Sequence, residues 1–206
     1  MSNITAAQVK ELRDATGVGL MDAKRALEET NGDMEAAMMV LRKSGAMKAA
    51  KMADRSNTEG VVASYIHGDG RIGVLVELSC ETDFVARNES FQELAHDLSL
   101  HIAATNPLYV SREDVPGELI EKETSLYTEQ LQAEGKPAER IEMIVKGKID
   151  KYLADIVLME QPFVKDDSQT IGQRIEAAVL TLGENVQIAR FARFAIGGHS
   201  NVCRVG

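Results

Sequence analysis

The segment Gly73-Val74-Leu75-Val76-Glu77-Leu78, followed at once by Ser79-Cys80-Glu81-Thr82-Asp83-Phe84-Val85-Ala86-Arg87-Asn88, decides how this chain is interpreted. The first six residues are typical of a strand in a buried sheet. The loop that follows places a large aromatic side chain among charged residues, and aromatic side chains are usually buried in their own protein. Two interpretations stand on the residues alone. Either Asp83 caps a turn and Phe84 fills the core, or Phe84 stands out and inserts into a pocket of a partner.

The sequence on either side of this segment predicts an α+β fold. Residues 61–66 and 72–76 predict two strands joined by a tight turn at 68–70, and residues 186–195 alternate as a third strand. A helix follows the second strand, with apolar side chains on one face at Phe91, Leu94, Ala95, Leu98 and Ile102. We therefore expect an antiparallel three-stranded sheet with helices on one face.

Residues 4–45 predict a compact unit of three helices. Thr5 and Gln8 have the spacing of a capping box, and Gly17-Val18-Gly19 separates the first helix from the second. Asp33 is placed to cap the third helix, which we expect to end at Gly45. This unit and the basic segment after it make up a predicted N-terminal domain at residues 1–55.

Two amphipathic helices are predicted at 118–134 and 138–156, with a short turn between them. Such a pair forms an antiparallel hairpin. We expect a projecting helical hairpin at about 117–156, inside a core domain that covers 56–196. Residues 197–206 have no core pattern, and we expect them to form a flexible tail.

Composition excludes several classes of protein. The formal net charge of −9 argues against nucleic-acid binding, which needs a basic face. No apolar run is long enough to cross a bilayer, and the start of the chain has no leader pattern, so we expect a cytoplasmic protein without membrane contact. Cys80 and Cys203 form no metal-type spacing, and we expect both thiols to be reduced.

Residues 42–57 are unusually basic for an acidic chain, with Arg42, Lys43, Lys48, Lys51 and Arg55 against Asp54 alone. One interpretation is a basic linker that meets an acidic partner surface. The other is a solvated helix end and tether, which is how charge runs usually occur.

No motif in the sequence indicates a catalytic, cofactor or metal site. Gly68-Asp69-Gly70-Arg71-Ile72-Gly73 matches the dinucleotide-binding pattern, but a strand follows the glycines where that motif requires a helix. His96 and His101 are five residues apart, which places them on different faces of a helix. We therefore expect no enzyme activity and no cofactor.

The loop and three other segments resemble one protein family. Thr82-Asp83-Phe84-Val85 is similar to the signature of the bacterial and organellar elongation factor Ts family. Residues 9–27 resemble the family's N-terminal domain. Tyr65-Ile66-His67-Gly68 with residues 71–76 resembles a core hairpin, and residues 160–164 resemble a later core segment. The matches follow in the expected order from about residue 4 to residue 196.

The resemblance implies a guanine-nucleotide exchange factor for the translational GTPase elongation factor Tu, with an N-terminal domain of the ubiquitin-associated type. It also implies that Phe84 inserts near the magnesium site of the GTPase. The residues that it implies in partner binding are Arg13, Leu20, Met21, Lys24, His67, Thr82, Asp83, Phe84 and Val85. The chain resembles the short members of the family, which lack the duplicated core of longer members. The resemblance to them implies a homodimer, and Phe191 and Phe194 are candidate interface residues. The alternative is a helix-binding adaptor or scaffold without exchange activity.

Overall fold

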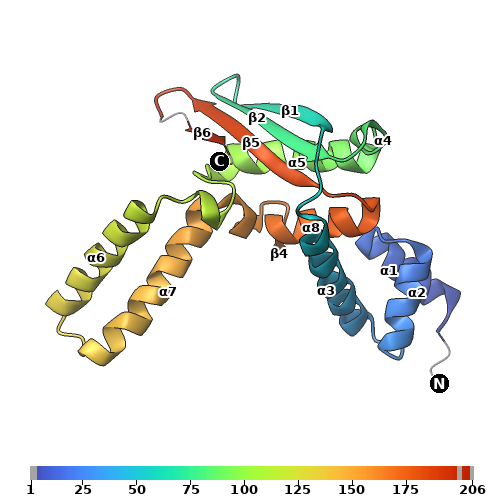
Figure 1. The fold of residues 1–206 in the computed structure, drawn as a ribbon, viewed down its shortest axis with the longest axis horizontal. Helices are drawn as coiled ribbons and strands as arrows, with labels where there is room; N and C mark the ends of the chain where they lie inside the picture. Colours follow the sequence, from blue (N-terminus) through green and yellow to red (C-terminus); the bar gives the residue numbers. More distant parts are fainter. Residues whose placement is uncertain (1–3, 199–200, 205–206) are drawn as a thin grey trace. The chain divides into compact units, whose positions relative to one another are not determined.

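The computed structural model describes residues 4–198 and 201–204, and they form an α+β fold (Figure 1). The helices are α1 (Ala6–Thr16), α2 (Leu20–Glu29), α3 (Met34–Met52), α4 (Asp83–Ala86), α5 (Glu89–Thr105), α6 (Gly117–Ala133), α7 (Ala138–Ile156) and α8 (Ile171–Leu182), with 3₁₀ turns η1 (Arg112–Asp114) and η2 (Leu158–Glu160). The strands are β1 (Glu59–His67), β2 (Ile72–Cys80), β3 (Pro162–Phe163), β4 (Asp166–Thr170), β5 (Gln187–Ala195) and β6 (Asn201–Arg204).

The chain divides into two compact units, each assembled from segments that are separate in sequence. One unit comprises the described residues of Met1–Val62, Glu77–Ala95 and Gly172–Ile188. The other comprises those of Ala63–Val76, His96–Ile171 and Ala189–Gly206. These units do not coincide with the predicted ranges 1–55 and 56–196, because two later segments belong with the N-terminal helices. An independent domain at 1–55 therefore stays a prediction.

The first unit begins with the three predicted helices, and the predicted caps are present. The Thr5 hydroxyl accepts a hydrogen bond from the Gln8 backbone N–H (3.3 Å), and the Gln8 side chain accepts one from the Thr5 N–H (3.0 Å). Gly17 ends α1 in the left-handed region, and Asp33 caps α3. The core between the helices consists mainly of Val9, Leu12, Val18, Ala23, Ala26, Leu27, Ala37 and Leu41.

The prediction that α3 ends at Gly45 is wrong, since the helix continues to Met52. Gly45 is buried against α8, where an added Cβ would lie 3.0 Å from the backbone oxygen of Glu176. This glycine therefore permits close packing of two helices instead of ending one. Most of the basic segment 42–57 is consequently helical.

Helix α8 was missed by the sequence analysis, and it packs on the N-terminal helices. Leu180 contacts the core of the three helices, and the Lys48 ammonium donates a hydrogen bond to the Leu180 carbonyl (3.3 Å). The buried residues Ile175 and Val179 lie at i, i+4 spacing, which is the signal that would have predicted this helix. Gly183 follows in the left-handed region (φ +81°) and turns the chain toward β5.

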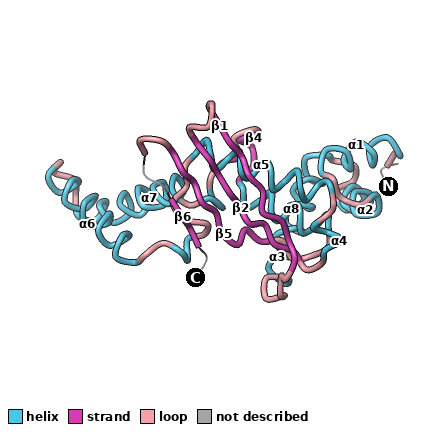
Figure 2. The backbone as a smooth tube through the Cα atoms, turned by 90° about the horizontal axis from the view of Figure 1, so that it is seen from above, coloured by secondary structure: helices cyan, strands magenta, loops and turns pink. Residues whose placement is uncertain are grey.

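The sheet has the strand order β1-β2-β5-β6, and Figure 2 shows β5 between β2 and β6. The predicted β1–β2 turn is present, with left-handed φ values at Gly68, Asp69 and Gly70. Strand β6 lies in a segment for which no element was predicted. It pairs antiparallel with β5, with Cys203 opposite Phe191, while residues 199–200 and 205–206 of the predicted flexible tail lie outside the described residues.

The second unit contains the predicted helical hairpin, in which α6 and α7 lie side by side (Figure 1). Gly135, with φ +72°, lies in the turn between them. Two small apolar clusters hold the helices together, one around Leu131, Ile141 and Val145 and one around Val115, Leu153 and Val157. Arg112 joins the base of the hairpin through ion pairs to Asp150 (3.0 Å) and Glu160.

Candidate functional site

The loop after β2, residues 81–88, folds around the single short helix α4 and exposes Phe84. Val85 is only 5% exposed and Ala86 is buried, whereas Phe84 is 80% exposed. Because Val85 and Ala86 occupy the inward positions of this helix, Phe84 faces outward. The interpretation in which Phe84 fills the core is therefore wrong. The Val85 side chain is buried in this conformation, and its contact with a partner stays a prediction.

Thr82, and not Asp83, caps α4. The Thr82 hydroxyl accepts a hydrogen bond from the Val85 backbone N–H (3.4 Å). Asp83 lies in the first turn and pairs with Arg87 one turn later (3.0 Å), with both side chains exposed. Thr82 and Asp83 are both exposed on the surface next to Phe84.

A carboxylate from a distant part of the sequence holds the start of the loop. Glu184, in the turn between α8 and β5, accepts hydrogen bonds from the backbone N–H groups of Glu81 (3.2 Å) and Thr82 (3.0 Å). Its other oxygen accepts one from the Thr82 hydroxyl (2.6 Å). Sequence reasoning missed Glu184, because no local pattern identifies a side chain that serves backbone groups about 100 residues away.

A second set of hydrogen bonds joins the same two segments, with a donor next to Glu184 and an acceptor in the loop. The Glu81 carboxylate accepts a hydrogen bond from the backbone N–H of Asn185 (2.8 Å) and pairs with Arg55 (3.2 Å). The hydrogen bond from Asn185, together with Arg55, lowers the pKa of Glu81 below its ordinary value. The Asn185 side chain donates to the Arg55 carbonyl (3.0 Å). We call Glu81, Thr82, Glu184 and Asn185 the loop clamp.

Cys80 lies directly before the clamp and is fully buried. Its thiol donates to the Thr82 carbonyl (3.2 Å), and burial together with the charge of Glu184 raises its pKa. The thiol is therefore neutral near pH 7, and it contributes packing rather than reactivity. Cys203 is also a buried, free cysteine with a pKa raised by burial.

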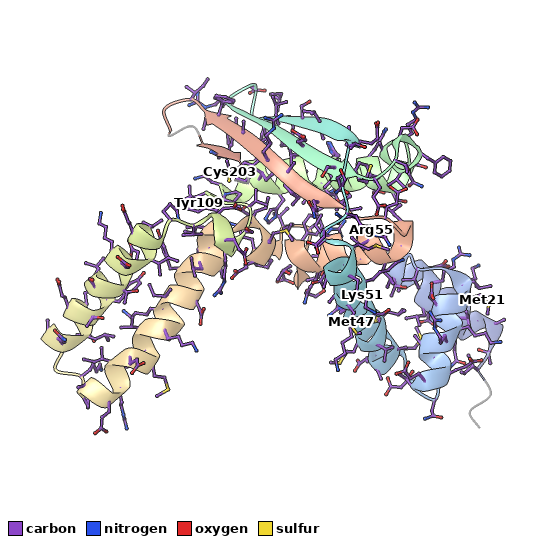
Figure 3. All side chains as sticks on the ribbon, viewed as in Figure 1. Met21, Met47, Lys51, Arg55, Tyr109 and Cys203 are labelled. Atoms are coloured by element: carbon purple, nitrogen blue, oxygen red, sulfur yellow. The ribbon has the colours of Figure 1, made fainter. Side chains whose placement is uncertain are left out.

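The second predicted contact lies on α2. Leu20 and Met21 are 54% and 72% exposed in the first turn of this helix, and Figure 3 shows Met21 on its outer side. Lys24 follows one turn later and pairs with Glu28 (3.6 Å). We call Leu20, Met21 and Lys24 the N-terminal patch. Both apolar side chains are exposed because Ala23, Ala26 and Leu27 supply the buried face of α2.

The other predicted residues are accessible but are engaged in local contacts. Arg13, near the end of α1, pairs with Asp14 (3.1 Å). His67, at the end of β1 in the second unit, accepts or donates a hydrogen bond with the Tyr65 hydroxyl (3.1 Å) and stacks on that ring. His101, in contrast, is completely buried.

The basic segment carries exposed methionine as well as charge. Met47 and Lys51 lie on the exposed side of α3, with Arg55 just beyond its end (Figure 3). Lys48 and Arg55 are bound within the chain, to Leu180 and Glu81. Both interpretations of this segment therefore stay predictions.

Within residues 4–198 and 201–204, no group of three or more His, Cys, Asp and Glu side chains could hold a metal ion. No helix in the same residues is long and apolar enough to cross a membrane. What this part of the chain does offer is an exposed phenylalanine on a fixed backbone and an exposed apolar patch on α2.

Comparison with known proteins identifies a family for this chain. The family model described as Elongation factor TS matches residues 23–198. The protein named elongation factor Ts from Geobacter sulfurreducens is 54% identical over 195 residues, which cover 95% of this chain and 90% of the relative. Proteins of the same name from Thermosipho melanesiensis and Oleidesulfovibrio alaskensis are 52% and 53% identical, and the matches cover 99% and 100% of their lengths.

Proposed function

The chain belongs to the elongation factor Ts family, and we propose that it promotes the release of GDP from the translational GTPase elongation factor Tu. The chain itself carries out no chemical step in this function. It binds the GTPase and weakens the hold of that protein on its nucleotide. We propose the cytoplasm as the place where it acts.

The observation that carries the proposal is the exposure of Phe84 on a backbone that is held on both sides of this residue, by the loop clamp before it and by the buried Val85 after it. A single exposed apolar side chain is ordinary on a protein surface. Phe84 differs because the loop clamp and the buried Val85 fix the backbone on which it stands. A side chain held in this way enters a partner's pocket without first losing backbone freedom.

Two contacts are proposed on the GTPase. The N-terminal patch, with Arg13 nearby in sequence, binds a helix of the nucleotide-binding domain through apolar side chains at helical spacing. Phe84 inserts between helices near the magnesium site, with Thr82 and Asp83 beside it. Displacing those helices disturbs the contacts to magnesium and phosphate. His67 is proposed as a further contact.

The proposed contacts supply enough binding free energy to weaken nucleotide binding. Factor and nucleotide weaken each other's binding by the same factor, because their binding free energies are linked. A thousandfold weakening corresponds to about 4 kcal/mol. Complete burial of one phenylalanine side chain contributes about 1.5–3 kcal/mol, so Phe84 and the N-terminal patch together are sufficient.

We also propose that the chain forms a homodimer. The second unit exposes Ile66, Leu75, Phe194 and Ile196, which are apolar residues on or next to the strands of the sheet. Phe191 does not belong to this surface, because it is almost completely buried. Sedimentation equilibrium at micromolar concentration is expected to give about twice the chain mass of 22.5 kDa. A mass near that of one chain would contradict the dimer.

Release of fluorescent GDP from preloaded elongation factor Tu tests the exchange function directly. Addition of the chain is expected to accelerate release at least about a hundredfold at saturation, since the proposed contacts supply several kcal/mol. Met39→Ala, which alters an exposed methionine on α3 outside both contacts, is expected to behave as the unaltered chain. Binding to the GTPase without acceleration would instead support the adaptor.

A further inference from the structure

We propose that Glu184 is a positioning residue that sets the direction in which Phe84 points. The effect on exchange rests on the proposed function, whereas the effect on the order of Phe84 does not. Glu184 lies 100 residues from Phe84 along the chain, and no motif in the sequence connects them.

The first step of the argument is where the carboxylate binds. Glu184 accepts the N–H groups of Glu81 and Thr82, which are the last backbone donors before α4 begins. The position of these two peptide groups determines where the helix starts. Since α4 has a single turn, its start also determines the direction of Phe84, two residues after Thr82.

The second step concerns the Thr82 hydroxyl, which has one proton and two lone pairs. It donates its proton to Glu184 (2.6 Å), which leaves its lone pairs free to accept the Val85 N–H (3.4 Å). Glu184 therefore fixes the orientation of the hydroxyl that the cap of α4 requires. Without Glu184 the hydroxyl is free to rotate, and the loop loses a backbone anchor and the order of its cap together.

The third step is that a rigid element carries Glu184. Gly183 ends α8 in the left-handed region, and Glu184 is the next residue. Helix α8 packs on α3 through Gly45 and Lys48, and Leu180 contacts the N-terminal core. The reciprocal hydrogen bond from Asn185 N–H to Glu81 prevents the two segments from separating at this point. Glu184 thus transmits the position of packed helices to the loop.

The absence of tryptophan from the chain allows a direct test. Phe84→Trp introduces a single fluorophore at the site, and time-resolved anisotropy then reports its local motion in the full chain. Glu184→Ala in this protein is expected to increase the amplitude of fast local motion about twofold or more, because anchored side chains move less than frayed ones. Glu184→Gln keeps an oxygen for the two N–H groups but presents an NH2 group to the Thr82 hydroxyl, so its value is expected to lie between those of the alanine variant and the unaltered side chain. An anisotropy decay that is the same with alanine at position 184 would overturn the proposal.

A double-mutant cycle tests the consequence for exchange. Glu184→Ala is expected to slow stimulated GDP release about tenfold, the factor that corresponds to loss of a charge-assisted hydrogen bond. In a Phe84→Ala background the same change is expected to slow release less than about twofold, because the residue that it positions is already absent. An equal effect in both backgrounds would show that Glu184 does not act through Phe84.

Far-UV circular dichroism and the temperature midpoint of unfolding verify that each variant is folded. If Glu184→Ala fails to fold, Glu184→Asp, whose shorter side chain draws the carboxylate away from the same three donors, is used with the same expectations. The two proposals fail separately. Failure of the unaltered chain to accelerate GDP release would remove the exchange function, while the anisotropy measurement still decides whether Glu184 positions residue 84.

Discussion

Phe84 in α4 and Phe91 in α5 are the same residue type only seven positions apart, yet their environments are opposite. Phe91 is completely buried, and Phe84 is 80% exposed. Helix α5 has 17 residues and an apolar face that includes Phe91, so periodicity determines its burial. Helix α4 has four residues, and Val85 and Ala86 take its inward positions. The comparison shows that a short capped turn can present an aromatic side chain to solvent while its backbone stays fixed.

The largest expected effect separates the two phenylalanines by stability. Phe91→Ala should lower the free energy of unfolding by about 3–5 kcal/mol, because it leaves a cavity in a packed interior. Phe84→Ala should change it by less than about 0.5 kcal/mol, as is usual for exposed positions. Urea unfolding followed by circular dichroism measures both. Similar losses for the two variants would mean that Phe84 is packed in solution.

A smaller effect tests the anchor of α4. Val85→Ala should lower the free energy of unfolding by about 1.5–2.5 kcal/mol through loss of buried apolar surface. Val62→Ala is the matched control, because Val62 is exposed on β1 in the same unit. If both valines tolerate the change equally, Val85 is not what directs Phe84 outward.

Acid should lower the free energy of unfolding through His101, the buried histidine of α5. The His101 Nε2 lies 3.0 Å from the Gln161 side-chain oxygen, and Nδ1 accepts the Val164 N–H (3.2 Å), so the ring is neutral. Burial lowers the pKa of His101 below its ordinary value of 6.5. The unfolded chain therefore binds the proton first, and this contribution to stability, fully present above pH 6.5, is lost as the pH falls toward the folded pKa.

Urea unfolding at several pH values between about 8 and 5 measures this slope. His101→Gln should flatten it, and His96→Gln, at an exposed position of the same helix, should leave it unchanged. A slope that persists in the His101 variant would assign the acid sensitivity to another group.

The smallest expected effect concerns the ion pair beside Phe84. Arg87→Ala removes the partner of Asp83, and both side chains are exposed. Such pairs contribute at most about 0.5 kcal/mol at helical spacing. Thermal unfolding should therefore show almost no change. A loss above about 1 kcal/mol would mean that the pair, and not the loop clamp, holds the turn.

Local signals in the sequence predicted most of the elements. The capping box at Thr5 and Gln8, the cap at Asp33 and the left-handed turn at 68–70 all depend on neighbouring residues, and all are present. The α6–α7 hairpin followed from its apolar spacing. Gly45 was misread because a glycine that ends a helix and one that permits close packing look identical in sequence.

The candidate site was less accessible to sequence reasoning. The residues around Phe84 alone favoured its burial, because aromatic side chains are usually buried in their own protein. Its exposure depends on Val85 turning inward, which those residues do not reveal. Glu184 was missed because its partners are backbone N–H groups, which carry no residue-specific signal. Strand β6 was missed because four residues are too few for an alternating pattern to be recognised.

The most direct measurement is the rate at which the folded Phe84→Ala variant, at saturating concentration, stimulates GDP release from elongation factor Tu. Loss of one buried phenylalanine contact, about 1.5–3 kcal/mol, predicts a rate roughly 10- to 150-fold below that of the unaltered chain, with unfolding stability unchanged. A folded variant that stimulates release at the normal rate would contradict the account, because the exposed ring would then have no part in exchange.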